Sequence, residues 1–288
     1  MQLKVHHRTE YLYTRAVSHN CNELRLTPPN TESQTCINSY ISVLPATRLR
    51  NYLDLNTNRV HHFEIPRPHN RLTIDSRSTV KTKSLVDLNN LPYGFHHKEL
   101  KHCTALEACH PFLQNSDFVE ITPTIWKQAL DIQDDSTDVF QTCYAMMAHI
   151  FEHYDYDPNA TTVHTHTNEI IENQTGVCQD FAHAMAALCR SIHIPTRYVS
   201  GYFFDATHDH SLRGAAASHA WVEVYIPPVG WIGLDPTNNK IVDETYIKLA
   251  VGRDYHAVAP VIGGYFGGDR SGLAVSVQVE RIDPHLDA

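Results

Sequence analysis

The sequence predicts an α+β protein in which a small antiparallel β-sandwich-like domain precedes a mixed core of helices and strands. Three observations support this. The first hundred residues form short β-type runs without helical periodicity, apolar residues recur at helix spacing between 136 and 193, and strand-type patterns return from 196 onward. Strands followed by helices and then by further strands are typical of α+β folds.

Residues 1–100 are expected to form the sandwich. Apolar and polar residues alternate from the start of the chain, with Leu3, Val5 and Tyr11 on one side, which is the period of a half-buried strand. Asn, Pro and Thr clusters separate the runs, as turn-forming residues do. The expected strands lie at 2–13, 36–44, 52–55, 60–65 and 72–80.

Residues 101–135 are expected to be a loop-rich connecting segment, because Pro92 and Pro111 interrupt the pattern around them. The core domain is expected over residues 136–262. Its first helix should begin at Ser136 or Thr137, since apolar residues then recur at steps of three and four. A short helix near 168–173 follows.

A second long helix is expected to begin at Cys178. Phe181, Met185 and Leu188 are spaced at helix period, and Cys178 lies three places before the first of them, in the first turn. A thiol there has a free backbone N–H and the positive end of the helix dipole beside it, and both favour the thiolate. Pro195 prevents the helix from continuing far past residue 193.

Three strands should follow this helix, at 196–204, 219–226 and 231–234. Pro227 to Gly230 supplies a turn between the last two, which makes them a hairpin. Folding about that turn brings His219 opposite residue 235, give or take three positions. Facing or diagonal cross-strand residues lie about 4.5–8 Å apart at Cβ, so an imidazole–carboxylate contact between His219 and Asp235 is geometrically allowed.

Residues 263–288 are expected to contain a glycine-rich loop and a last strand. Gly263-Gly264 and Gly267-Gly268 favour a flexible loop because glycine adopts conformations closed to other residues. Apolar and polar residues then alternate from Leu273 to Glu280, as expected for a strand.

Cys178, His219 and Asp235 occur in an order that suits a catalytic triad. Cys178 would be the nucleophile, His219 the proton acceptor and donor, and Asp235 the group that orients the imidazole. The backbone N–H of Cys178 can stabilise an oxyanion, and Gln174 and Tyr156 are candidates for a second donor. Each residue taken alone could have a purely structural role in packing or in a turn, but the three together favour catalysis. This chemistry needs no cofactor.

Composition limits the kinds of partner and compartment. The chain of 288 residues has 23 Lys and Arg against 32 Asp and Glu, a net charge of −9 with histidines neutral, which argues against nucleic acid as a partner. No apolar stretch could span a bilayer, and the first residues lack the apolar region of a signal peptide. Seven scattered cysteines, an odd number, favour reduced thiols, so we expect a cytoplasmic protein without membrane association.

The 21 histidines raise the alternative of a metal enzyme. His149, Glu152 and His153 form the H-x-x-E-H pattern of inverted zinc proteases. The later sequence offers no matching third ligand, so we expect no catalytic metal.

Four blocks of the chain closely resemble the bacterial transglutaminase-like superfamily, a branch of the papain-type cysteine hydrolases. They are TGVCQDFAH at 175–183, IPTRYVSGY at 194–202, SHAWVEVY at 218–225 and GWIGLDPTN at 230–238. The β-rich first part resembles the N-terminal region of bacterial members. The resemblance implies a papain-like core with the nucleophile on a helix packed against a sheet that carries His and Asp. Within these blocks, the candidates for lining or supporting the site are Arg197, Tyr198, Tyr202, Trp221 and Trp231, each of which also suits plain packing.

One departure narrows the reaction that the resemblance implies. Trp follows the catalytic Cys in the calcium-activated crosslinking enzymes, whereas Gln179 follows it here, and no loop has the spacing of a calcium site. We therefore expect an amide or peptide hydrolase that forms an acyl-thioester with a peptide or protein substrate. Acyl transfer to an amine is the alternative, and a non-catalytic binding module is a third.

Overall fold

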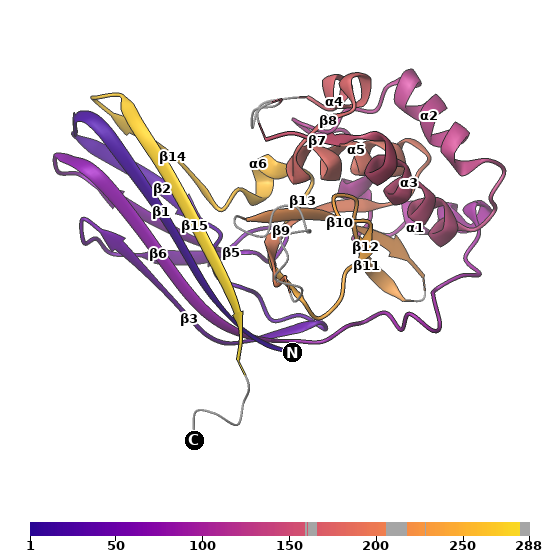
Figure 1. Cartoon of the computed structure of the whole chain (residues 1–288), viewed down its shortest axis with the longest axis horizontal. Helices are drawn as coiled ribbons and strands as arrows, with labels where there is room; N and C mark the ends of the chain where they lie inside the picture. Colours follow the sequence, from indigo (N-terminus) through magenta and orange to yellow (C-terminus); the bar gives the residue numbers. More distant parts are fainter. Residues whose placement is uncertain (159, 161–165, 206–217, 228, 283–288) are drawn as a thin grey trace.

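The computed structural model describes residues 1–158, 160, 166–205, 218–227 and 229–282, and it divides into a β-sandwich and a helix-covered sheet (Figure 1). The sandwich consists of two four-stranded antiparallel sheets with strand orders β15-β1-β6-β3 and β14-β2-β5-β4. The other part contains a five-stranded antiparallel sheet of order β12-β11-β10-β9-β13. The predicted α+β fold class is confirmed.

The two sheets of the sandwich share one apolar core. Strand β1 alternates buried and more exposed residues, as its sequence predicts, and its buried side chains Leu3 and Val5 meet Leu24 and Phe63 of the facing sheet. The eight strands of the sandwich are β1 (Gln2–Val17), β2 (His19–Leu24), β3 (Gln34–Leu44), β4 (Arg50–Leu53), β5 (Arg59–Ile65), β6 (His69–Thr82), β14 (Val261–Phe266) and β15 (Arg270–Arg281).

The last two strands of the sandwich come from the opposite end of the chain. Figure 1 shows β14 and β15, in yellow, beside the indigo strands β2 and β1. The prediction of a loop at Gly263-Gly264 is therefore wrong, because these residues lie within β14. A Cβ at Gly263 would collide with the Cys21 carbonyl of the neighbouring strand, so glycine serves close strand approach there. The hairpin turn is at Gly267 and Gly268, whose φ values are 82° and 51°.

The five-stranded sheet carries its helices on one face (Figure 1). Strand β10 turns Ala220, Val222 and Val224 toward helix α5, where they join the largest apolar cluster. Helix α5 is the central helix, and every residue after Cys178 in it is buried. The strands are β9 (Thr196–Phe203), β10 (His219–Ile226), β11 (Gly230–Asp235), β12 (Lys240–Ile241) and β13 (Tyr246–Gly252).

The helices predicted from the sequence for the core agree with the observed ones, whereas the helices before the core are not predicted. The predicted helix at 136 or 137 begins at Val139, because Asp138 caps it by accepting a hydrogen bond from the Gln141 N–H. The connecting segment expected to be loop-rich contains α1 and α2, and α2 begins at Pro123 directly after its cap Thr122. The α-helices are α1 (Leu100–Thr104), α2 (Pro123–Gln133), α3 (Val139–His153), α4 (Thr167–Asn173), α5 (Cys178–Ser191) and α6 (Tyr255–Val258).

Buried hydrogen bonds connect the sandwich to the sheet of the core. The Tyr202 hydroxyl lies 2.7 Å from His7 Nδ1, and both side chains are buried. The Asn58 amide donates to the Val251 carbonyl and accepts from its N–H, each at 2.8 Å. These contacts fix strands β9 and β13 to the sandwich. In the described part of the chain, no helix has the length and apolar character needed to cross a membrane.

Candidate active site

A short parallel strand pair sets the start of helix α5. Strand β8 (Thr175–Gly176) pairs with β7 (Asp155–Tyr156), and α5 begins two residues later. The Asp180 carboxylate accepts a hydrogen bond from the Val177 N–H at 2.8 Å. A Cβ on Gly176 would lie 2.6 Å from the same carboxylate, so only glycine leaves room for this cap.

Cys178 is the first residue of α5 and its one partly exposed residue. Burial raises the pKa of the Cys103 thiol and raises that of Cys109 to about 11. Apart from Cys178, the cysteines with partial exposure are Cys21 and Cys36, which lie in the sandwich. Among the core cysteines, Cys178 is thus the one whose residue is partly exposed.

The expected contact between His219 and Asp235 is present. The Nε2 atom of His219 lies 2.7 Å from Oδ2 of Asp235, and both side chains are fully buried. In the hairpin, Val222 pairs with Leu234, so Asp235 lies one diagonal step from His219. That offset is within the tolerance that the turn predicts.

Asp235 accepts more hydrogen bonds than the sequence indicates. Its Oδ2 also accepts from the Tyr246 hydroxyl at 2.8 Å and from the Asn238 amide at 2.9 Å. Its Oδ1 accepts from the Thr237 N–H at 2.9 Å. Burial alone would raise the pKa of Asp235, but the charge of His219 and these hydrogen bonds lower it, so the carboxylate remains ionised.

The surroundings of His219 favour its protonated form. Burial lowers the pKa of the imidazole, while the charge and hydrogen bond of Asp235 and the neighbouring Cys178 side chain together raise it to about 10. The Nδ1 atom is buried and has no hydrogen-bond partner of ordinary geometry among the described residues. With Nε2 on Asp235, Nδ1 is the nitrogen left to exchange a proton with Cys178.

Two tyrosines lie close enough to Cys178 to respond to its charge. Burial first, and then the charge of Cys178, raises the pKa values of Tyr198 and Tyr255. Tyr198 lies in a block that the sequence marks as a site candidate. Tyr255 is not identified from the sequence, because it belongs to the four-residue helix α6, which has no periodic pattern of its own. The backbone N–H of Tyr255 donates to Nε2 of His183 at 3.1 Å, which fixes this segment beside α5.

Arg197 and Tyr202 have their polar groups engaged elsewhere. Arg197 Nε donates to the buried Glu223 carboxylate at 2.6 Å, and the guanidinium lies 4.3 Å from the Trp231 ring centre. Tyr202 uses its hydroxyl in the bond to His7. The structure does not bring these two polar groups to the thiol, and a supporting role for either residue stays a prediction.

Trp221 contacts the candidate triad through His219. The two rings stack with centres 6.2 Å apart, and Trp221 also packs edge-on against Tyr246 at 5.3 Å. Trp221, Trp231 and Tyr246 line a cavity of about 130 Å³ between the sheet and the sandwich. Trp221 therefore supports the histidine from the side of the sheet that carries this cavity.

The two candidates for a second oxyanion donor lie near the start of α5. Tyr156 pairs with Gly176 in the β7–β8 ladder, and its ring packs edge-on against Phe181, with centres 6.2 Å apart. Gln174 ends helix α4 in the left-handed conformation, with φ of 52°. Both side chains are partly exposed, so the oxyanion role of each stays a prediction.

The H-x-x-E-H pattern does not form a three-ligand group. His149 and His153 stack with ring centres 4.3 Å apart on helix α3. Within the part of the chain that the structure describes, the one group of three converging ligand atoms is Cys21, His62 and Glu64. That group lies in the sandwich, far along the sequence from the histidine pattern.

The chain matches two protein-family profiles and is similar to several known proteins. The profile of the transglutaminase-like superfamily matches residues 127–236, and the profile of the bacterial transglutaminase-like N-terminal region matches residues 3–81. An uncharacterized protein of Mycobacterium leprae is 33% identical over 285 residues, which cover 98% of this chain and 99% of the relative.

Two further relatives bear on fold and chemistry. A solved structure of a proposed cysteine protease from Cytophaga hutchinsonii superposes with a TM-score of 0.75 and 22% identity, covering 98% of this chain and 92% of that chain. At this identity the likeness shows the fold. A protein-glutamine gamma-glutamyltransferase of Pseudomonas aeruginosa is 32% identical over 132 residues, which are 42% of this chain and 20% of that protein.

Proposed function

The chain belongs to the transglutaminase-like superfamily, and we propose on that premise that it is a cysteine-dependent amide or peptide hydrolase. The proposal assigns Cys178 as nucleophile, His219 as general base and acid, and Asp235 as the group that orients the imidazole. One observation carries it: the buried His219–Asp235 pair, joined at 2.7 Å, lies beside the one partly exposed residue of helix α5.

The first half of the reaction forms the acyl-enzyme. Nδ1 of His219 already holds the proton taken from the Cys178 thiol, and the resulting thiolate attacks the carbonyl carbon of the substrate amide. The carbonyl oxygen gains negative charge, which the Cys178 N–H at the helix start stabilises. The C–N bond then breaks, and the imidazolium gives its proton to the departing amine. A thioester on Cys178 remains.

The second half releases the acyl group. Water attacks the thioester carbon while Nδ1 of His219, now neutral, accepts its proton, and the sulfur leaves as a thiolate beside the imidazolium when the carboxylic acid forms. The four hydrogen bonds on Asp235 support this cycle, because they keep the carboxylate ionised next to an imidazole that alternates between charge states.

Acyl transfer is the second candidate function. It uses the same thioester, but a primary amine takes the place of water. The similarity to the Pseudomonas protein-glutamine gamma-glutamyltransferase is the observation that favours it. The two reactions differ in how well the site excludes water and binds an amine.

Purified protein given an activated amide, with and without a primary amine, tests the proposal. Hydrolysis predicts free acid in both cases, and Cys178→Ala should abolish it while His149→Ala leaves it unchanged. Product that requires the amine, with no free acid, would replace hydrolysis by transfer. Activity that survives Cys178→Ala would reject both reactions, and a Cys178 that alkylates no faster than Cys36 would favour a binding module.

A further inference from the structure

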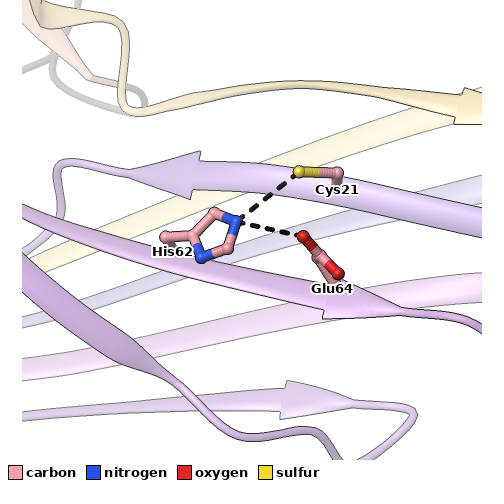
Figure 2. A group of neighbouring side chains, drawn as sticks. All are labelled: Cys21, His62 and Glu64. Atoms are coloured by element: carbon pink, nitrogen blue, oxygen red, sulfur yellow. Dashed lines mark hydrogen bonds and ion pairs between the residues drawn. The ribbon is translucent and has the colours of Figure 1, made fainter.

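Three side chains with metal-ligating atoms converge on the sandwich sheet β14-β2-β5-β4. Figure 2 shows Cys21 and Glu64 directed toward the imidazole of His62. Nε2 of His62 lies 3.7 Å from the Cys21 sulfur and 3.7 Å from a Glu64 oxygen. The three ligand atoms all lie within 4.8 Å of one another.

Strand register brings this group together. Cys21 on β2 pairs directly with Glu64 on β5, and His62 precedes Glu64 by two residues, so all three side chains share one face. The neighbours Asn20, Asn22 and Leu24 of β2 are buried on the opposite face, toward the sandwich core. The group therefore lies on the outer face, with Cys21 and His62 partly exposed and Glu64 exposed.

The spacing suits a metal ion better than direct pairing. A nitrogen–oxygen separation of 3.7 Å is longer than a hydrogen bond, so the imidazole and the carboxylate do not satisfy each other fully. Tetrahedral zinc, with bonds of about 2.3 Å to sulfur and about 2.0–2.1 Å to nitrogen and oxygen, places sulfur and nitrogen about 3.5 Å apart and nitrogen and oxygen about 3.4 Å apart. The two separations of 3.7 Å from His62 Nε2 differ from these values by only a few tenths of an ångström.

A second carboxylate on the same face is already engaged. Glu23 pairs with His62 across the strands, but it accepts a hydrogen bond from the Tyr52 hydroxyl at 2.6 Å and forms an ion pair with Arg25 at 3.3 Å. Three protein ligands are thus available, and the exposure of Glu64 leaves a fourth position for water.

We propose that Cys21, His62 and Glu64 bind a divalent metal ion of the zinc class. One thiolate, one imidazole and one carboxylate form a ligand set that binds a borderline-soft ion such as zinc in preference to calcium or magnesium. Binding deprotonates the Cys21 thiol and releases the proton to solvent, so affinity falls as pH is lowered. The site lies in the sandwich, whereas Cys178 begins helix α5 of the core. It ties strand β2 to strand β5, independently of the proposed hydrolase chemistry.

Cobalt titration of the metal-free protein tests the site directly, because a thiolate–cobalt bond absorbs in the near ultraviolet. We expect one equivalent of Co²⁺ to give this absorption, and Zn²⁺ to displace it. Cys21→Ser should abolish the band, while His62→Ala and Glu64→Ala should weaken binding by about tenfold or more. Cys36→Ser, which changes the other partly exposed sandwich cysteine, is the matched control and should bind as the unchanged protein does.

The same titration on Cys178→Ala separates this site from the active site. Retention of the band there supports the proposal, whereas its loss would assign the metal to Cys178 and overturn the proposal. Failure of the unchanged protein to bind Co²⁺ or Zn²⁺ at micromolar concentration would also overturn it.

A second measurement needs no variant and so does not depend on folding of a mutant. Zn²⁺ should protect Cys21 from alkylation, measured by mass spectrometry of its peptide, and should leave the Cys36 peptide unprotected. Equal labelling of Cys21 with and without Zn²⁺ would show that the three side chains do not bind the metal, and it would overturn the proposal.

Discussion

The Tyr246 hydroxyl and the His219 imidazole donate to the same oxygen of Asp235, at 2.8 and 2.7 Å. Tyr246 begins strand β13, which lies at the far edge of the sheet from the strand that carries Asp235. The carboxylate that accepts a hydrogen bond from the histidine is therefore itself held by a strand with no part in the hairpin.

This relationship separates the roles of two residues. Asp235→Asn should lower kcat/KM by about 10²–10⁴, because the amide no longer stabilises the imidazolium and favours the wrong tautomer. Tyr246→Phe removes one hydrogen bond to a charged group, which should cost about 1.5–3 kcal/mol of stability and about tenfold in kcat/KM. Equal losses of kcat/KM in the two variants would contradict the assignment.

Cys178 should be the fastest-reacting thiol of the chain. Iodoacetamide labelling followed by mass spectrometry should show Cys178 modified first, and His219→Ala should slow that reaction by about tenfold or more, since the base that accepts its proton is gone. Labelling of Cys36 is the internal control and should not change. A Cys178 rate that is indifferent to His219 would remove the basis for the proposed nucleophile.

The stability of the protein should depend on pH through His219. The folded-state pKa of about 10 lies above the ordinary value of 6.5, so protonation of His219 stabilises the fold below pH 6.5, and this contribution is lost as pH rises toward 10. Asp235, whose pKa is lowered from 3.8, contributes above that pH and loses its contribution in stronger acid.

Urea unfolding of the unchanged protein and of His219→Asn measures this dependence. The difference in the free energy of unfolding should be largest near pH 6 and should shrink steadily toward pH 10. A difference that grows over this range would mean that the imidazole is neutral in the folded protein.

Gly176→Ala should destabilise the start of helix α5. The new methyl group would lie 2.6 Å from the Asp180 carboxylate and would displace the cap on Val177, for which we expect a loss of about 1–3 kcal/mol together with reduced activity. Gly264→Ala is the matched control, because a Cβ there has no atom within 4 Å. Similar losses in thermal unfolding of both variants would contradict this explanation.

The sequence is sufficient to predict the centre of the site, since local patterns determine it. Phe181, Met185 and Leu188 reveal the period of α5 and thus the position of Cys178 in its first turn. The turn at Pro227 to Gly230 sets the register that brings His219 to Asp235. Both inferences need only short stretches of chain.

The parts that depend on distant contacts could not be predicted in this way. Tyr246 and Tyr255 reach the site because β13 pairs with β9, and no local pattern shows that pairing. Arg197 lies in a matching block, yet Glu223 holds it in a buried ion pair on the sheet. Helix α2 is not predicted from the sequence, although Pro123 suits the first turn of a helix and Thr122 its cap.

The pairing of β14 with β2 and of β15 with β1 has a consequence during synthesis. A ribosome delivers β1 and β2 first, but their outer partners β15 and β14 emerge only after the whole five-stranded sheet. Until then both early strands present unpaired backbone edges, which are prone to join other chains. These edges stay open until the last two strands close the sandwich.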